Sequence, residues 1–145
     1  MECLSKIHSR LRGAFRGYRS EAVFQLSNGQ VWQQRRYKYK YKYKYQPTVN
    51  IRLEHGRWQA EFDCMDEPIE VVRIQIFEEG TIISEFNGFD RNSRFEFQSG
   101  RVWEQAEYKH AYHHAHRPEA LVISGISGVM LHVTGMSEHV RVRQA

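Results

Sequence analysis

The chain carries one sequence unit twice, with the second copy 71 residues after the first. The segment 24–34, FQLSNGQVWQQ, returns without a gap as the segment 95–105, FEFQSGRVWEQ. Between Phe15 and Ile74, 14 of the 60 positions hold the residue that is found 71 positions later. A repeat of about 70 residues can enclose a small core of its own, whereas solenoid repeats are shorter. We therefore expect two tandem domains, residues 1–74 and residues 75–145.

The spacing of the apolar residues is typical of strands. Apolar and polar residues alternate around Phe24 and Leu26 and along 49–53, which is the period of a half-buried strand. Glycine-containing turn signals and the paired Pro47 and Pro118 separate these runs. The pattern predicts an all-β fold of two tandem SH3-like small β-barrels related by the internal repeat. A single sandwich of about ten to twelve strands is the alternative, and residues 2–12 fit either a short helix or a first strand.

The two halves differ in charge. The chain has a net charge of +4, but residues 1–74 hold 14 Lys and Arg against 8 Asp and Glu, whereas residues 75–145 hold 7 against 9. The first half is therefore the candidate for anionic partners. A hydrophobic content of 41% argues against a disordered chain.

Cysteine content and hydropathy indicate a location. Cys3 and Cys64 are the only cysteines and neither belongs to a C-x-x-C motif, which is typical of a reduced protein of the cytoplasm. The first residues contain no apolar run that suits a signal peptide, and no stretch approaches the ~18 apolar residues of a membrane span. We expect a cytoplasmic protein without a membrane partner.

Tyrosine and lysine alternate from Tyr37 to Tyr45. In a strand this alternation places the tyrosines on one face and the lysines on the other. The structural interpretation is that the tyrosines pack inward while the lysines stay in water and protect a sheet edge. Nine residues in a strand span about 30 Å, so part of this tyrosine–lysine segment should extend beyond a small barrel.

Two functional interpretations of this segment remain open. Aromatic rings stack on bases and cations neutralise phosphates, which suits nucleic acid, and tyrosine is equally favoured in protein-binding and oligomer interfaces. Exposure of the tyrosine rings distinguishes the two interpretations, because buried rings exclude stacking on bases. The candidate binding residues are Arg35, Arg36, Tyr37, Lys38, Tyr39, Lys40, Tyr41, Lys42, Tyr43 and Lys44, to which Arg52 and Arg57 could add.

The second copy replaces this segment with a run that contains several histidines. His110, His114 and His116 share one face of a strand and are candidate ligands of a transition metal. No cysteine or carboxylate of a known metal site lies nearby in the sequence, so histidine can equally replace tyrosine as a ring with a polar tip. We expect no bound metal and no cofactor, and a face whose charge changes near pH 6–7 in either case.

Trp32 and Trp103 follow the turn glycines of the two copies. Packing in a core is the first interpretation, and a ligand platform is the second. The chain holds no G-x-S-x-G and no H-E-x-x-H motif, and most of its carboxylates do not match between the copies. The sequence therefore favours a protein that is not an enzyme, although an active site in one half stays open.

The motifs F-x-G-[YF], F-x-[LF]-x-[NS]-G-x-V-W-x-Q and Y-K, followed by a proline and a V/I strand, resemble a family of uncharacterised small bacterial β-domains. The usual form of that family, F-x-L-x-N-G-Q-x-W-x-Q with P-x-V-x-I, is kept by the segments 24–34 and 47–51. The second copy departs from it at Phe97, Ser99 and Arg101. The chain also resembles hypothetical proteins of mobile integron gene cassettes, and the segment 88–90 resembles Sm-like RNA-binding barrels. The resemblance implies a fold and no activity.

These observations predict a protein of unknown function that is most simply a non-catalytic module binding a protein or a small ligand. A homodimer through an edge strand is one arrangement of such a module. The alternative is a nucleic-acid-binding protein that uses the tyrosine–lysine segment of the first copy.

Overall fold

The computed structural model describes residues 6–136 and 138–145. Every helix or strand assigned in this part of the chain is a β-strand, and the strand pairs are antiparallel. The predicted all-β class is confirmed. The chain divides into two compact units, Met1–Ile74 and Gln75–Ala145, which we call the first and the second unit. Residues 1–5, with Cys3 and the start of the undecided segment 2–12, lie outside the described residues.

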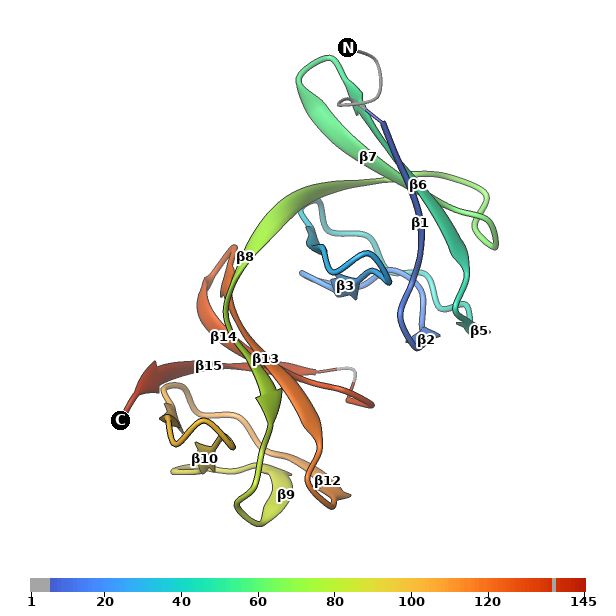
Figure 1. The fold of residues 1–145 in the computed structure, drawn as a ribbon. Coiled ribbons are helices and arrows are strands. Elements are labelled where there is room, and N and C mark those ends of the chain that lie inside the picture. The colour runs from blue at the N-terminus through green and yellow to red at the C-terminus, as the bar shows by residue number, and fades with distance from the viewer. Residues whose placement is uncertain (1–5, 137) are drawn as a thin grey trace. The chain divides into compact units, whose positions relative to one another are not determined.

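The first unit is built from the first seven strands and the beginning of the eighth. They are β1 (Lys6–Arg10), β2 (Ala14–Phe15), β3 (Val23–Gln25), β4 (Val31–Gln34), β5 (Lys44–Tyr45), β6 (Thr48–Glu54), β7 (Arg57–Phe62) and residues 69–74 of β8 (Ile69–Thr81). The sheet runs β1-β6-β7-β8-β4-β3, and Figure 1 shows β1, β6 and β7 side by side. Strands β2 and β5 form a separate two-stranded ribbon.

The second unit is built from the end of β8 and seven further strands. These are β9 (Phe86–Phe89), β10 (Arg94–Glu96), β11 (Val102–Gln105), β12 (Ala111–Ala115), β13 (Glu119–Gly125), β14 (Gly128–Val133) and β15 (His139–Gln144). The sheet runs β8-β13-β14-β15-β11-β10, with β9 and β12 as the separate ribbon. The register pairs Trp32 with Arg73 in the first unit and Trp103 with Gln144 in the second.

Each unit encloses its own aromatic core. In the first unit Phe15 and Phe62 stack with 4.4 Å between ring centroids, and Trp32 is buried beside them. In the second unit Phe86 and Phe95 pack at 6.0 Å. Large rings that remove apolar area from water supply most of the stabilisation of domains this small.

The sheets of the described residues are open paths, and no closed barrel is found among them. A single isolated bridge joins Leu11, which follows β1, to Leu26, which follows β3. The corresponding bridge of the second unit joins Ile82 to Phe97. The two ends of each sheet path are thus brought together by one residue pair.

A candidate binding surface of the first unit

The tyrosine–lysine segment 37–45 is mostly irregular backbone. Only Lys44 and Tyr45 belong to a strand, β5, which pairs with β2. One further bridge holds the segment, because Lys40 and Tyr18 exchange two backbone hydrogen bonds of 2.8 and 3.1 Å. The long strand expected from the alternation is therefore replaced by a segment whose backbone pairs, among the described residues, only with Tyr18 and with β2.

The tyrosine rings of this segment face solvent, so the expected inward packing is wrong. Their exposed fractions range from 54% to 74% in Tyr37, Tyr39, Tyr41, Tyr43 and Tyr45. Rings from β2, β3 and β7 already fill the core below. We call these five side chains the tyrosine row.

Three lysines of the segment are paired with carboxylates. Nζ of Lys38 lies 2.7 Å from Glu67, Nζ of Lys40 lies 3.4 Å from Asp66, and Nζ of Lys44 lies 3.2 Å from Asp63. The hydrogen bond and the charge of Lys38 lower the pKa of Glu67 below its ordinary value. The segment between β7 and β8 thus neutralises most of the lysine charge that the sequence assigned to phosphates.

Gly17 and Gln34 hold the backbone of the segment close to the rest of the first unit. A Cβ atom on Gly17 would lie 2.0 Å from the carbonyl oxygen of Lys40, and the φ of Gly17 is +92°. Gln34 is fully buried, and its Nε2 donates to the carbonyl oxygens of Arg36 and Lys38 at 2.8 and 3.1 Å. The same arrangement occurs 71 residues later with Gly88. The backbone that carries the tyrosine row is thus held against the rest of the first unit.

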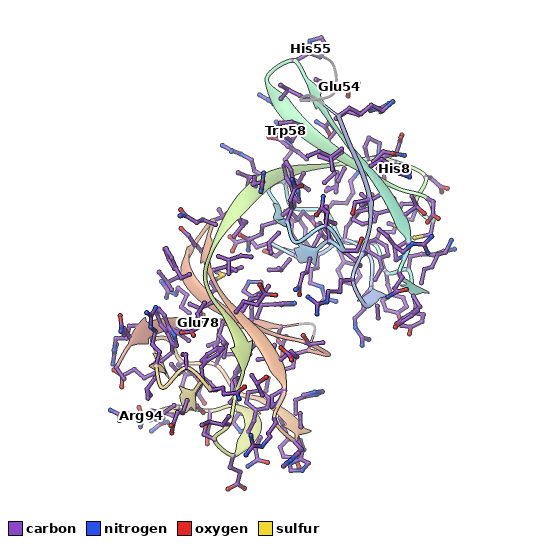
Figure 2. The ribbon with its side chains drawn as sticks, viewed as in Figure 1. His8, Glu54, His55, Trp58, Glu78 and Arg94 are labelled. Atoms are coloured by element: carbon purple, nitrogen blue, oxygen red, sulfur yellow. The ribbon has the colours of Figure 1, made fainter. Side chains whose placement is uncertain are left out.

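Three arginines converge on one glutamate next to the row. Nε of Arg36 donates to Oε1 of Glu70 at 2.9 Å, while Arg35 and Arg57 approach the same carboxylate at 3.7 and 3.8 Å. With Trp58 and neighbouring residues they line a hollow of about 450 Å³, which we call the arginine hollow. Figure 2 shows Trp58 on β7, near the hairpin that carries Glu54 and His55.

The second unit presents a mixed row of tyrosine and histidine rings. Tyr108, His110, Tyr112, His114 and His116 are all exposed. Nδ1 of His114 lies 2.9 Å from Oδ1 of Asn87, where a hydrogen bond forms. No group of three or more ligating side chains in the described part of the chain is placed to hold a metal ion, so His110, His114 and His116 are not brought together.

Trp32 and Trp103, which are 71 residues apart, both lie in the cores. Trp32 and Trp103 are 1% and 6% exposed. Their indole N–H groups donate to Gln30 at 3.1 Å and to Glu78 at 3.2 Å. Rings this covered offer almost no area to a ligand, and the structure offers Trp58 in the arginine hollow instead.

Two features of the surface were not identified from the sequence. Trp58 and Glu70 join Arg35, Arg36 and Arg57 only in the folded sheet, and Val129 and Arg141 stand at the corresponding positions of the second copy. The signal in the sequence that could have drawn attention to Glu70 was that Arg141 stands at its position in the second copy.

The thiol of Cys64 is free, and burial raises its pKa, which keeps it a poor nucleophile.

Comparison with known proteins finds no relative. No protein-family model matches the chain, and neither a curated protein nor a solved structure matches it. In the described residues there is no helix with the length and apolar character needed to cross a membrane.

Proposed function

We propose that this protein is a non-catalytic binding module and that the tyrosine row of the first unit contacts its ligand, a partner protein or a small molecule. The observation that carries the proposal is the exposure of five tyrosine rings in nine consecutive residues, each at least 54% exposed. Exposed aromatic surface is energetically unfavourable in water, and contiguous patches of it mark interaction sites. Tyrosine contributes large area with few rotatable bonds, which suits binding hot spots.

The charges around the row favour a protein ligand. Lys38, Lys40 and Lys44 are each paired with a carboxylate, so the lysines of the segment contribute little net charge to the surroundings of the row. The centres of protein interfaces are depleted of net charge and enriched in tyrosine and arginine. Because Gly17 and Gln34 hold the backbone of the segment, the loss of backbone entropy on binding is reduced.

The proposal includes the fold and the location. We propose that each unit is an SH3-like barrel and that the two are copies of one repeat. The bridges Leu11–Leu26 and Ile82–Phe97 support this, because each joins the two ends of a sheet path. A free thiol at Cys64 is in keeping with the cytoplasm.

The test is a selection from a random peptide library displayed on phage. The target is the wild type, and the enriched peptides are synthesised and titrated by calorimetry. A variant with Tyr39→Ser, Tyr41→Ser and Tyr43→Ser should bind them at least about tenfold more weakly. A control with Tyr108→Ser and Tyr112→Ser should bind them as the wild type does. Equal binding by all three proteins, or no enrichment at all, would remove the tyrosine row as a protein-binding surface.

A second candidate function is the binding of single-stranded nucleic acid. The observation in its favour is that Tyr37 directly follows Arg35 and Arg36, which belong to the arginine hollow. Stacking platforms next to cationic grooves are the usual construction of such binders. The tyrosine rings are exposed, so bases can stack on them, which buried rings would prevent.

Fluorescence anisotropy with labelled single- and double-stranded DNA and RNA, across a salt series, tests this second candidate. We expect single strands to bind more tightly than duplexes and to dissociate as salt rises. The Tyr→Ser variant should lose the preference for single strands. A variant with Lys38, Lys40, Lys42 and Lys44 replaced by Gln should keep its fold by circular dichroism and change the salt dependence only slightly. Flat anisotropy at low salt would eliminate nucleic acid as the ligand.

A further inference from the structure

The arginine hollow presents more hydrogen-bond donors than its single carboxylate uses. Only the contact from Arg36 to Glu70, at 2.9 Å, has hydrogen-bond length. The side chains of Arg35 and Arg57 lie 3.7 and 3.8 Å from the carboxylate and are 61% and 56% exposed. Each guanidinium carries five N–H groups in a planar fork, so donors on two forks remain available to an incoming group.

The charge of the hollow defines the ligand further. Three guanidinium groups and the carboxylate of Glu70 leave a formal surplus of two positive charges. A phosphate monoester carries about −1.5 to −2 at neutral pH and offers three acceptor oxygens, whereas a carboxylate offers one charge and two oxygens. The planar fork of arginine binds phosphate oxygens in pairs. A phosphate monoester therefore matches both the charge and the donors.

The wall of the hollow is aromatic. Trp58 lines it, and the ring of Trp58 is held edge to face against buried Trp32 with 5.3 Å between centroids. A ring that is fixed in this way provides a surface for a planar group attached to the phosphate. The hollow of about 450 Å³ lies in the range of sites for small molecules.

The second unit has no equivalent of this site. The positions 71 residues after Arg35, Arg57 and Trp58 hold Ala106, Gly128 and Val129. Two cations and the aromatic wall are missing there. The hollow is therefore a property of the first unit that the shared fold does not require.

The geometry points to a binding site for a phosphate monoester that carries a planar ring, with Arg35, Arg36 and Arg57 on the phosphate and Trp58 on the ring. Glu70 offsets the repulsion among the three guanidinium groups and orients that of Arg36. The site lies beside the tyrosine row and does not depend on which ligand the row binds. The same chemistry is offered by a free nucleoside monophosphate and by the phosphorylated end of an oligonucleotide.

Calorimetric titration with AMP at low ionic strength tests the site, with tryptophan fluorescence as a second readout. We expect a Kd of about 1 mM or tighter, and binding at least about tenfold weaker for adenosine, which lacks the phosphate. Inorganic phosphate should bind more weakly than AMP, because it lacks the ring. An oligonucleotide with a 5′-phosphate, compared with its unphosphorylated form, decides the source: equal affinity of the two forms assigns the site to free nucleotides.

Arg57→Gln and Arg94→Gln form the matched pair of variants. Both arginines are exposed and ion-paired, at 3.8 Å and 3.3 Å, and Arg94 belongs to the second unit. Arg57→Gln should weaken AMP binding by about tenfold or more, Arg57→Lys by less, and Arg94→Gln should have no effect. Undetectable AMP binding, equal binding of adenosine and AMP, or equal losses in Arg57→Gln and Arg94→Gln would each overturn the proposal. Equal binding of phosphate and AMP would overturn the role of Trp58.

Discussion

Arg36 and Glu70 form a hydrogen-bonded ion pair in which Nε of the arginine donates to Oε1 of the glutamate at 2.9 Å. The residues 71 positions later are Glu107 and Arg141, and they also form an ion pair, with 3.7 Å between Nε and Oε1. The pair is thus present at the same place in both units with its charges exchanged. In the first unit the glutamate faces two further arginines, which makes this place cationic in that unit alone.

Glu70→Gln should destabilise the protein through repulsion among the three arginines. All three guanidinium groups are largely exposed, so we expect a loss of only about 1 kcal/mol in the free energy of unfolding at low salt. The loss should shrink as salt rises, because the Debye length falls from ~10 Å at 0.1 M to ~3 Å at 1 M. Urea denaturation at two salt concentrations measures both effects.

Glu107→Gln is the control for this prediction. Glu107 faces a single arginine, Arg141, whose backbone N–H it also accepts at 2.7 Å, and glutamine can keep that hydrogen bond. We expect a smaller loss with little dependence on salt. Identical losses and identical salt responses in the two variants would show that the arginine cluster carries no repulsion for Glu70 to offset.

Gly17→Ala should detach the tyrosine–lysine segment from the first unit. The added Cβ would lie 2.0 Å from the backbone oxygen of Lys40, and backbone has little freedom to move. Gly29 has a similar φ of +91° but no atom within 4 Å of its Cβ position. Gly29→Ala should therefore cost only the ~1–2 kcal/mol of a left-handed alanine, and Gly17→Ala clearly more. Thermal unfolding of both variants tests this, and equal costs would contradict the close approach.

Gln34→Leu should loosen the same segment by a different route. The side chain of Gln34 is buried, donates to two carbonyl oxygens and accepts the N–H of Arg19 at 2.9 Å. Leucine has a similar size but leaves all three backbone groups unpaired. Each unpaired group costs about 1–3 kcal/mol where water does not replace the bond. We expect a loss of about 2–4 kcal/mol and faster amide exchange at Lys40.

Gln105→Leu is the matched experiment in the second unit. Gln105 donates to the carbonyl oxygens of Glu107 and Lys109, both at 2.9 Å, and accepts the N–H of Asp90 at 3.0 Å. A comparable loss is expected there. A neutral result in both units would mean that water replaces the glutamine side chain.

The sequence predicted the all-β class because alternation and turn residues are local signals. Phe24 and Leu26 stand two residues apart on either side of Gln25, and both are buried as the period requires. Strand β3 ends before the turn that contains Gly29. Information of this kind lies within a few residues of each element.

The orientation of the tyrosine row could not be predicted in the same way. Alternation shows that Tyr39 and Lys40 lie on opposite faces, but not which of the two faces inward. That choice depends on carboxylates that are distant in the chain, such as Asp66, which is 26 residues from Lys40. The arginine hollow likewise joins residues from the end of β4, from β7 and from β8. Such a meeting depends on the sheet order, which the repeat alone does not specify.

The stability of the protein should fall in mild acid because of His132. Its Nδ1 atom is buried without a hydrogen-bond partner in the described part of the chain, and His139 lies opposite it on β15. Burial, and then the charge of His139, lower the pKa of His132 from 6.5 to about 4. The unfolded chain therefore binds a proton below pH 6.5 that the folded chain does not bind until about pH 4.

It follows that His132 should lower the free energy of unfolding by up to about 3 kcal/mol as the pH falls from 6.5 to 4. Below pH 4 this contribution should level off. Urea denaturation of the wild type and of His132→Phe at several pH values measures the effect. The two proteins differ at this one residue, so the difference between the two curves reports the effect of His132 and of its interaction with His139. Above pH 7 the difference in the free energy of unfolding between the two proteins should be constant. Below pH 7 the wild type should lose stability relative to His132→Phe. Parallel curves would show that His132 is protonated in the folded protein as readily as in the unfolded chain.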